Sequence, residues 1–212
     1  MIIAQGAYGW KVSVVDGLAA AATTTYHTRM DFERVLKALL DELQRQRVRY
    51  GAIGGFALVA LGVPRMTLDV DFLVHRDDLT MFDQSLQQLG YRRVAMTENV
   101  SHYRHADRAW GSIDVLHAFR PHSLAMLERA AEHPLFGATQ HLKVLQPEDI
   151  IGLKIQAMAN DPLRQLKERT DIEALAARYG PQLDWRRVRE YYALFELDTE
   201  AQQLQERFGH AQ

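Results

Sequence analysis

The stretch Ile53–Val74, IGGFALVALGVPRMTLDVDFLV, is largely apolar, but two glycines stand near its start and two aspartates near its end. The glycines are Gly54 and Gly55, and the aspartates are Asp69 and Asp71. Burying two like charges side by side is costly unless a cation neutralises them. The acidic pair therefore indicates a functional site. Because the glycines stand at a fixed separation from the acids, we expect both to contribute to it.

The segment TLDVDFLV, residues 67–74, has the composition of a strand. Because side chains alternate along a strand, Asp69 and Asp71 point the same way, with Cα atoms about 7 Å apart. Oxygen ligands of this kind suit Mg²⁺ or Mn²⁺. Two alternatives stay open: a solvated strand face without a ligand, and the metal-binding DxD of a glycosyltransferase.

The diglycine ends a predicted strand over 48–53 and begins a short helix over 56–62. Bare backbone N–H groups at a helix start favour an anion such as phosphate. Together with metal-binding carboxylates, this turn indicates phosphoryl chemistry on a nucleotide. Arg65 and Thr67, which lie between the two features, could contact that substrate or serve only the turn and the start of the strand.

A third carboxylate lies in GSIDVLHAF, residues 111–119, where Asp114 shares one strand face with Ser112. If this strand neighbours the first, Asp114 is a further ligand in a two-metal site or the general base for an attacking hydroxyl. A capping or ion-paired role is the alternative. His102 and His105 could form a metal pair, but without an H-E-x-x-H context they fit solvated loop histidines better.

Composition narrows the class of protein. The 212 residues include 25 Lys and Arg against 27 Asp and Glu, so the net charge of −2 gives no bulk attraction to nucleic acid or membrane. The chain has no cysteine, which excludes disulfides and thiolate chemistry and fits a cytoplasmic protein. No apolar run approaches the 18 residues of a membrane span.

The order of patterns predicts an α/β (α+β) fold with a small mixed sheet, followed by a helical C-terminal subdomain, and a site between the two. Strands and helices alternate up to about residue 146, including a helix over 121–133. Residues 1–29 show no clear period and are expected to be a loose or non-native extension. The expected units are 1–29, 30–146 and 147–212, with C-terminal helices over 147–159, 162–179, 184–196 and 198–208.

The helical part carries charged residues in apolar surroundings. Lys154 falls in the middle of the apolar stripe of its helix, and Arg164, Lys167 and Asp171 line one strip of the next helix. We expect Lys154 and Lys167 to contact a triphosphate, with Asp171 orienting Lys167 at i,i+4 and Arg164 in support. The alternatives are a snorkelling core lysine at position 154 and a plain intrahelical ion pair at 167 and 171.

Glycine-glycine followed after 13 residues by DVD, with a later strand aspartate, resembles the nucleotidyltransferase superfamily, which has the polymerase-beta-like fold. Within it, the opening stretch is similar to the family of AbiEii/AbiGii toxin-type nucleotidyltransferases. LQPEDIIGLKIQAMANDPLRQLKERTDIEALA resembles the helical segment of the same proteins, so the similarity covers about residues 47–178.

This resemblance implies a Mg²⁺-dependent enzyme that moves NMP from an NTP to a hydroxyl of an RNA, such as tRNA, or of a protein. It also implies a toxin-like role with a cognate antitoxin; the alternative is a non-catalytic nucleotide-binding or antitoxin-like protein of the same fold. In that superfamily the residues matching Asp69 and Asp71 bind metal, and the one matching Asp114 is a ligand or base. The usual turn is Gly-Ser, whereas here Gly55 precedes Phe56, so the phosphate contact must rest on backbone and basic residues.

Overall fold

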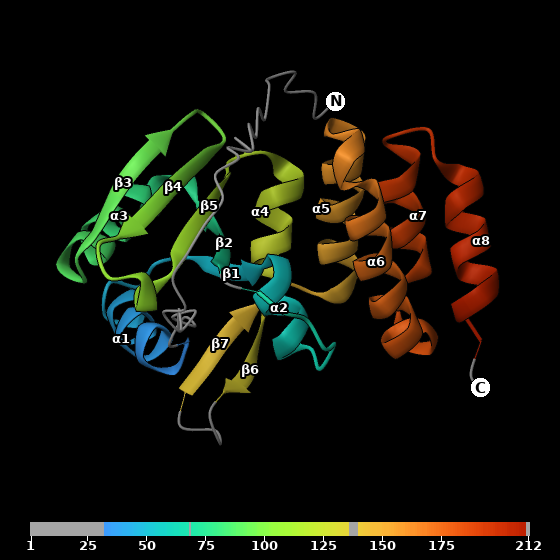
Figure 1. Cartoon of the computed structure of the whole chain (residues 1–212). Helices are drawn as coiled ribbons and strands as arrows, with labels where there is room; N and C mark the ends of the chain where they lie inside the picture. Colours follow the sequence, from blue (N-terminus) through green and yellow to red (C-terminus); the bar gives the residue numbers. More distant parts are fainter. Residues whose placement is uncertain (1–31, 68, 136–139, 211–212) are drawn as a thin grey trace, which may run out of the picture.

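The computed structural model describes residues 32–67, 69–135 and 140–210, so the expected extension over 1–29 lies outside the described residues. A seven-stranded mixed sheet forms one part of the molecule, and four C-terminal helices stand beside it (Figure 1). This arrangement confirms the predicted mixed α/β fold. Among the described residues, no helix is long and apolar enough to cross a membrane.

The sheet has the strand order β3-β4-β5-β2-β1-β7-β6. The central pair β2 and β5 is parallel, whereas β1 runs antiparallel to β2 and β4 antiparallel to β5. The parallel β1–β7 pair and the antiparallel hairpin β6–β7 complete the sheet. The strands are β1 (Tyr50–Ile53), β2 (Asp69–His75), β3 (Tyr91–Met96), β4 (Val100–His105), β5 (Ser112–Ala118), β6 (Ala131–Leu135) and β7 (Gln140–Val144).

One face of the sheet is closed by helices α1 (Phe32–Arg45) and α3 (Leu79–Gln88). Its core contains a run of edge-to-face aromatic contacts from Tyr50 through Phe72 and Phe82 to Tyr103. On the other face, α4 (Pro121–Glu128) packs against β2 and β5. Since strand side chains alternate, the residues that flank Phe72 point to the α4 face.

The hairpin β6–β7 corrects the sequence expectation of a helix over 121–133. The helix ends at Glu128, and the chain enters β6 at Ala131. Pro134 is tolerated because β6 is an edge strand, where one N–H is dispensable. Pairing of β7 with β1, which buries Val144, is a non-local contact that a helical period in the sequence does not reveal.

The helical part begins with α5 (Pro147–Asn160), which packs against α6 (Gln165–Tyr179) and α7 (Trp185–Ala193). Helix α8 (Asp198–Phe208) closes the array against α7. All described helices after Pro147 thus follow the predicted ranges closely. The array is tied to the loop after α2 (Gly54–Ala60), because Arg178 Nε and Tyr179 Oη donate to the carbonyl of Leu61 at 2.9 and 2.8 Å.

Candidate active site

The strands of the two acidic motifs are neighbours. In the parallel register of β2 and β5, Asp69 lies opposite Ser112 and Asp71 lies opposite Asp114. Residues paired across neighbouring strands project from the same sheet face. The sheet therefore brings all three predicted carboxylates to one face, the face that also carries α4.

The diglycine turn lies directly against these acids. Gly54 has a φ of +66°, and a Cβ at this position would overlap the carboxylate of Asp71. At Gly55 a Cβ would come to 3.0 Å from the side chain of Thr67 and 3.6 Å from Cγ of Arg65. Only glycine combines this positive φ with so close an approach of backbone to carboxylate. The predicted glycine, threonine and arginine positions thus lie close together and beside Asp71.

The carboxylate of Asp71 is poorly compensated. Burial raises the pKa of Asp71 to about 7, and the neighbouring charges of Asp114 and Asp69 add to that rise. The ammonium groups of Lys167 and Lys154 lower this pKa, but by less. A hard cation such as Mg²⁺ or Mn²⁺ prefers the oxygen atoms of clustered carboxylates as ligands, and its charge offsets theirs. The residues present therefore fit the predicted metal.

The three acids are not, however, a preformed cage: in the part of the chain that the structure describes, no group of three or more His, Cys, Asp or Glu is gathered to hold a metal ion. Two of them contact neighbouring side chains instead. Asp114 Oδ1 accepts from Nδ1 of His102 at 2.9 Å and lies 3.4 Å from Nη1 of Arg104. Ser112 Oγ donates to Asp69.

The basic residues of the helical part divide into two kinds. Lys154 is buried, and its Nζ donates to Glu168 at 2.8 Å and to Asp171 at 2.6 Å. Arg164 completes this cluster through Glu168 at 2.5 Å. The side chains of Lys154 and Asp171 are only 8% and 5% exposed. Lys154 is therefore a satisfied core cation in this structure, neither snorkelling to solvent nor open to a phosphate.

The expected i,i+4 pair between Asp171 and Lys167 is not formed. Instead, the carboxylate of Asp171 lies 2.6 Å from Lys154 and 3.3 Å from Nε of Arg65. The expectation failed because helical spacing cannot show that a partner on another element lies closer. Lys167 is left exposed, with its charge acting on Asp71. Arg65 thus lies beside the glycine turn and pairs with Asp171, whereas Lys167 is the exposed predicted cation whose charge acts on Asp71.

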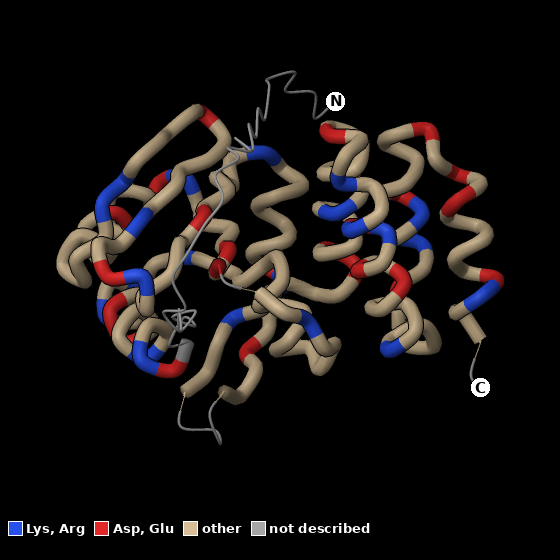
Figure 2. The backbone as a smooth tube through the Cα atoms, viewed as in Figure 1, with Lys and Arg blue, Asp and Glu red and all other residues tan. Residues whose placement is uncertain are grey.

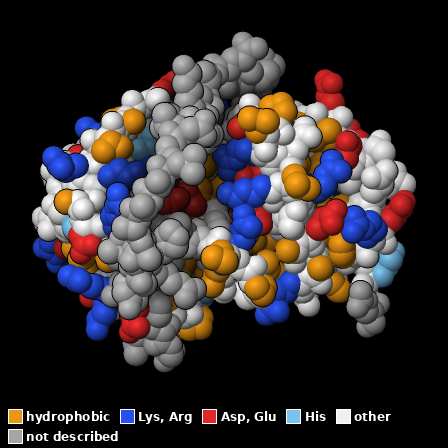
Figure 3. Space-filling view, viewed as in Figure 1, with side chains coloured by type: hydrophobic (Ala, Val, Ile, Leu, Met, Phe, Trp, Pro, Cys, Tyr) orange, Lys and Arg blue, Asp and Glu red, His pale blue; other side chains and the backbone are white. Residues whose placement is uncertain are grey.

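The whole arrangement lies at the border between the two parts of the molecule. Figure 3 shows acidic side chains near the centre of the view, with Lys and Arg side chains beside them toward the helical part. Figure 2 shows that acidic positions lie on the central strands and that α5 and α6 carry both acidic and basic positions. Both signs of charge therefore lie together at this border.

Sequence reasoning missed the residues of β4 that contact Asp114. The sequence indicates only a metal ligand or a loop residue at His102, and it singles out no role for Arg104. In the antiparallel register of β4 and β5, His102 lies opposite Asp114 and Arg104 opposite Ser112. Alternation along VSHYRH does place both on one strand face, but the pairing register that aligns them with Asp114 cannot be read from one sequence.

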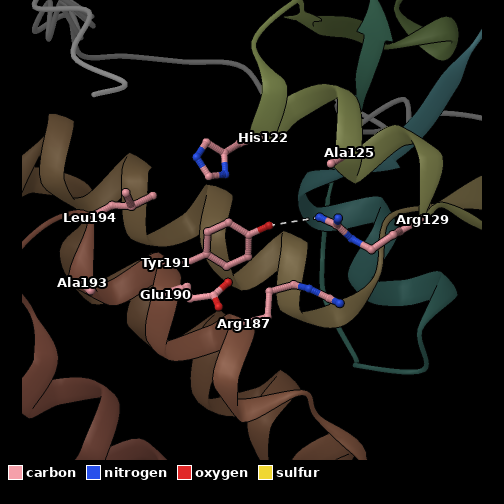
Figure 4. Close-up of a pocket in the computed structure, with 8 residues that line it drawn as sticks. All are labelled: His122, Ala125, Arg129, Arg187, Glu190, Tyr191, Ala193 and Leu194. Atoms are coloured by element: carbon pink, nitrogen blue, oxygen red, sulfur yellow. Dashed lines mark hydrogen bonds between the residues drawn. The ribbon is translucent and has the colours of Figure 1, made fainter.

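A separate cavity of about 450 Å³ lies between α4 and α7 (Figure 4). It contains none of the predicted site residues. On its wall, Arg129 pairs with the buried carboxylate of Asp149 at 2.8 Å, and the hydroxyl of Tyr191 donates to the same carboxylate at 2.7 Å. These contacts join α4, α5 and α7. The lining residues are His122, Ala125, Arg129, Arg187, Glu190, Tyr191, Ala193 and Leu194.

Solved structures with a similar fold are nucleotidyltransferases at low sequence identity. ANT(2'')-Ia in complex with adenylyl-2''-tobramycin has a TM-score of 0.61 at 16% identity, over 77% of this chain and 97% of that one. An antigenic nucleotidyltransferase-like protein from Paracoccidioides brasiliensis has a TM-score of 0.52 at 18% identity, and the match covers 83% of this chain and 92% of that one. The lincosamide antibiotic adenylyltransferase LnuA, bound to lincomycin, has a TM-score of 0.50 at 16% identity, and the match covers 69% of this chain and 97% of that one.

These likenesses establish the fold alone. No curated protein matches the chain. A family described as uncharacterised nucleotidyltransferase matches residues 11–205, which is most of the sequence. The resemblance to the superfamily is thereby confirmed, whereas the narrower AbiEii/AbiGii assignment is not shown. The chain belongs to this nucleotidyltransferase family and is a nucleotidyltransferase enzyme.

Proposed function

We propose that the enzyme transfers NMP from an NTP to a hydroxyl acceptor with Mg²⁺ or Mn²⁺ and releases pyrophosphate. The observation that carries this proposal is the register of Asp71 beside Asp114, directly over the diglycine turn. That geometry supports a nucleotide phosphate between a backbone anion site and a cation-binding carboxylate pair.

On the nucleotide side, the backbone of Gly54 and Gly55, with Arg65 and Lys167, holds the triphosphate. Asp69 and Asp71 would hold the divalent cation, with Asp114 as the third candidate ligand. When bound, the cation offsets the charge that develops on the phosphate oxygens during transfer. Asp171 fixes Arg65 beside the turn at 3.3 Å, and Lys154 and Glu168 complete the support from behind.

On the acceptor side, Asp114 takes the proton of the attacking hydroxyl. The acceptor oxygen forms a bond to the α-phosphorus, the bond from that phosphorus to the pyrophosphate oxygen breaks, and the proton passes to the carboxylate. His102 and Arg104 both contact Oδ1 of Asp114, so Oδ2 is the oxygen that can receive the proton. Holding the base from one side leaves it little freedom to rotate away.

The direct test is incubation of the purified protein with each α-labelled NTP, Mg²⁺, and total RNA or total protein. We expect label transfer by the wild type and none by Asp69→Asn or Asp71→Asn. Calorimetry should show Mg²⁺-dependent NTP binding in the wild type only. Unchanged NTP and Mg²⁺ binding in the double variant Asp69→Asn/Asp71→Asn would show that the carboxylate pair is not the metal site.

A toxin-like role in the cytoplasm, with a cognate antitoxin, is a finer proposal that rests on the sequence resemblance. Its test is expression of the wild type against Asp71→Asn: growth arrest by the wild type alone would support it. The alternative, a non-catalytic nucleotide-binding or antitoxin-like protein, is disfavoured because the acidic row with its glycine turn is intact. NTP binding without transfer to RNA or protein would favour that alternative.

A further inference from the structure

The face that carries the acids continues to the open edge of the sheet. One row across the strands joins Arg92 on β3, Arg104 on β4, Ser112 on β5 and Asp69 on β2. Directly paired residues share a face, so Arg92 and Arg104 stand on the same face as the acids. Both arginines are exposed.

These two arginines form a like-charged cross-strand pair. Neighbouring strands are about 4.8 Å apart, and like charges directly opposite each other are destabilising. Within the described residues, Arg92 has no acidic partner, and the one acid near Arg104 is Asp114 at 3.4 Å. The adjacent Arg93, which points to the other face, is paired with Asp83 at 3.4 Å. On the α3 face Arg93 thus has its own acid, whereas on the site face the two opposite arginines share Asp114 as their one nearby acid among the described residues.

Strand order decides which substrate these arginines would meet. The glycine turn follows β1, on one side of the acids, whereas β4 and β3 lie on the other side of β5. If the nucleotide occupies the glycine side, a hydroxyl that reaches Asp114 arrives over β4 and β3. An acceptor in that position passes directly over Arg104 and Arg92.

We propose that Arg92 and Arg104 bind a phosphate group of the acceptor, so that the enzyme modifies a phosphate-bearing molecule such as an RNA end or a nucleotide. This inference rests on the proposed transfer reaction and names its acceptor class. Two guanidinium groups on adjacent strands can grip one phosphate through paired N–H donors. A polycation such as tobramycin, which ANT(2'')-Ia carries as its adenylyl derivative, would meet repulsion from both arginines.

The test measures equilibrium binding in the presence of Mg²⁺ and a non-hydrolysable NTP analogue. The probe is a fluorescent single-stranded RNA with a free 3′ hydroxyl, with AMP and tobramycin as unlabelled competitors. The double variant Arg92→Gln/Arg104→Gln is compared with Arg186→Gln, which removes an exposed arginine of α7. We expect RNA binding at least about tenfold weaker in the double variant only.

Salt dependence gives a readout that a structural role would not change. Each lost phosphate contact should reduce the slope of log affinity against log salt by about 0.7. NTP affinity should be the same in all three proteins, since the arginines lie on the acceptor side. Competition by AMP at low concentration would identify a single phosphate as the recognised group, and RNA binding that AMP does not displace would identify a longer chain; both support phosphate recognition.

Equal RNA binding by the double variant and the control would overturn the inference, and so would failure of the wild type to bind RNA or AMP. A loss of NTP affinity in the double variant would do the same by assigning the arginines to the nucleotide. Transfer to tobramycin that the double variant retains would refute the inference while keeping the transfer reaction. RNA binding through the arginines without label transfer would refute the reaction and keep the phosphate site.

Discussion

Two groups of charged residues lie in apolar surroundings of this molecule, and they are built in opposite ways. In the helical part, Lys154 is bonded to Glu168 and Asp171, and each carboxylate has a second cation nearby. On the sheet, burial raises the pKa of Asp71 to about 7, and the charges of Asp114 and Asp69 add to that rise. Removing one member of a compensated buried cluster is costly to the fold, whereas carboxylates with raised pKa values are typical of functional sites.

The largest effect should come from breaking the compensated cluster. Replacing Lys154 by Met leaves the carboxylates of Glu168 and Asp171 buried without their shared cation. Removing one partner of a buried ion pair costs about 3–5 kcal/mol. Urea denaturation should therefore show a much lower midpoint for Lys154→Met than for the wild type.

The matched control is Lys167→Met, which removes an exposed cation from the next helix. It should change the free energy of unfolding by no more than about 0.5 kcal/mol. A second variant, Lys154→Met/Glu168→Gln, should recover part of the lost stability because one unpaired charge is gone. A loss below about 1 kcal/mol in Lys154→Met would mean that the cluster is not needed for stability.

The next largest effect concerns the rate of nucleotide transfer, which should depend on Asp114. Asp114→Asn should bind Mg²⁺ and NTP with near-normal affinity but transfer nucleotide at least about a hundredfold more slowly, the usual scale for losing a general base. Single-turnover kinetics and calorimetry on the same samples separate the two quantities. Transfer within a few-fold of the wild type would refute its role as base. A loss of NTP binding as large as in Asp69→Asn would make it a ground-state metal ligand.

A smaller effect is the pH dependence of stability without metal. The folded chain holds the proton of Asp71 up to about pH 7, whereas the unfolded chain releases it near pH 4. The folded state therefore binds more protons between these values, so this carboxyl lowers stability as pH rises through that window. After discount for solvent screening, the effect is about 1–2 kcal/mol.

In chelator-treated protein, Asp71→Asn should consequently be more stable than the wild type at pH 8, and this difference should shrink toward pH 4. Thermal unfolding at several pH values, always as variant minus wild type, removes the contribution of the other titrating groups. A difference independent of pH would show that burial and the acidic neighbours do not raise the pKa of Asp71 in the folded chain. Added Mg²⁺ and NTP should reverse the order at pH 8.

Local patterns predicted the parts of the site that depend on one strand or turn. Alternation placed Asp69 and Asp71 on one face, and the glycines marked a backbone that Asp71 approaches closely. The neighbour relation of Asp114 to Asp71 was stated only as a condition, since pairing between distant strands is not encoded locally. The β6–β7 hairpin was missed for the same reason.

Partners across helices were equally hidden. The apolar stripe around Lys154 indicated burial, and the structure agrees. Glu168 was overlooked because a single charged residue on an amphipathic helix usually faces solvent. Its burial follows from the packing of α6 against α5, which no period in one helix reveals. Sequence thus identified buried charges but not which of them neutralise one another.

The smallest expected effect is the loss of NTP affinity when Lys167 is replaced. Lys167 is exposed and takes no part in the buried cluster around Lys154. Its charge lowers the pKa of Asp71, so it lies within electrostatic reach of the acids. Lys167→Met should therefore leave stability unchanged and weaken NTP binding by about three- to tenfold, since backbone N–H groups and Arg65 still hold the phosphates. Calorimetry with Mg²⁺ and NTP measures the loss, and raised ionic strength should shrink the difference from the wild type because an exposed charge is screened.

Arg186→Gln serves as control for an exposed cation on another helix, α7. Equal NTP affinity in Lys167→Met and the wild type would leave Arg65 and the glycine backbone as the phosphate contacts, and the helical part would then serve the site through Asp171 alone.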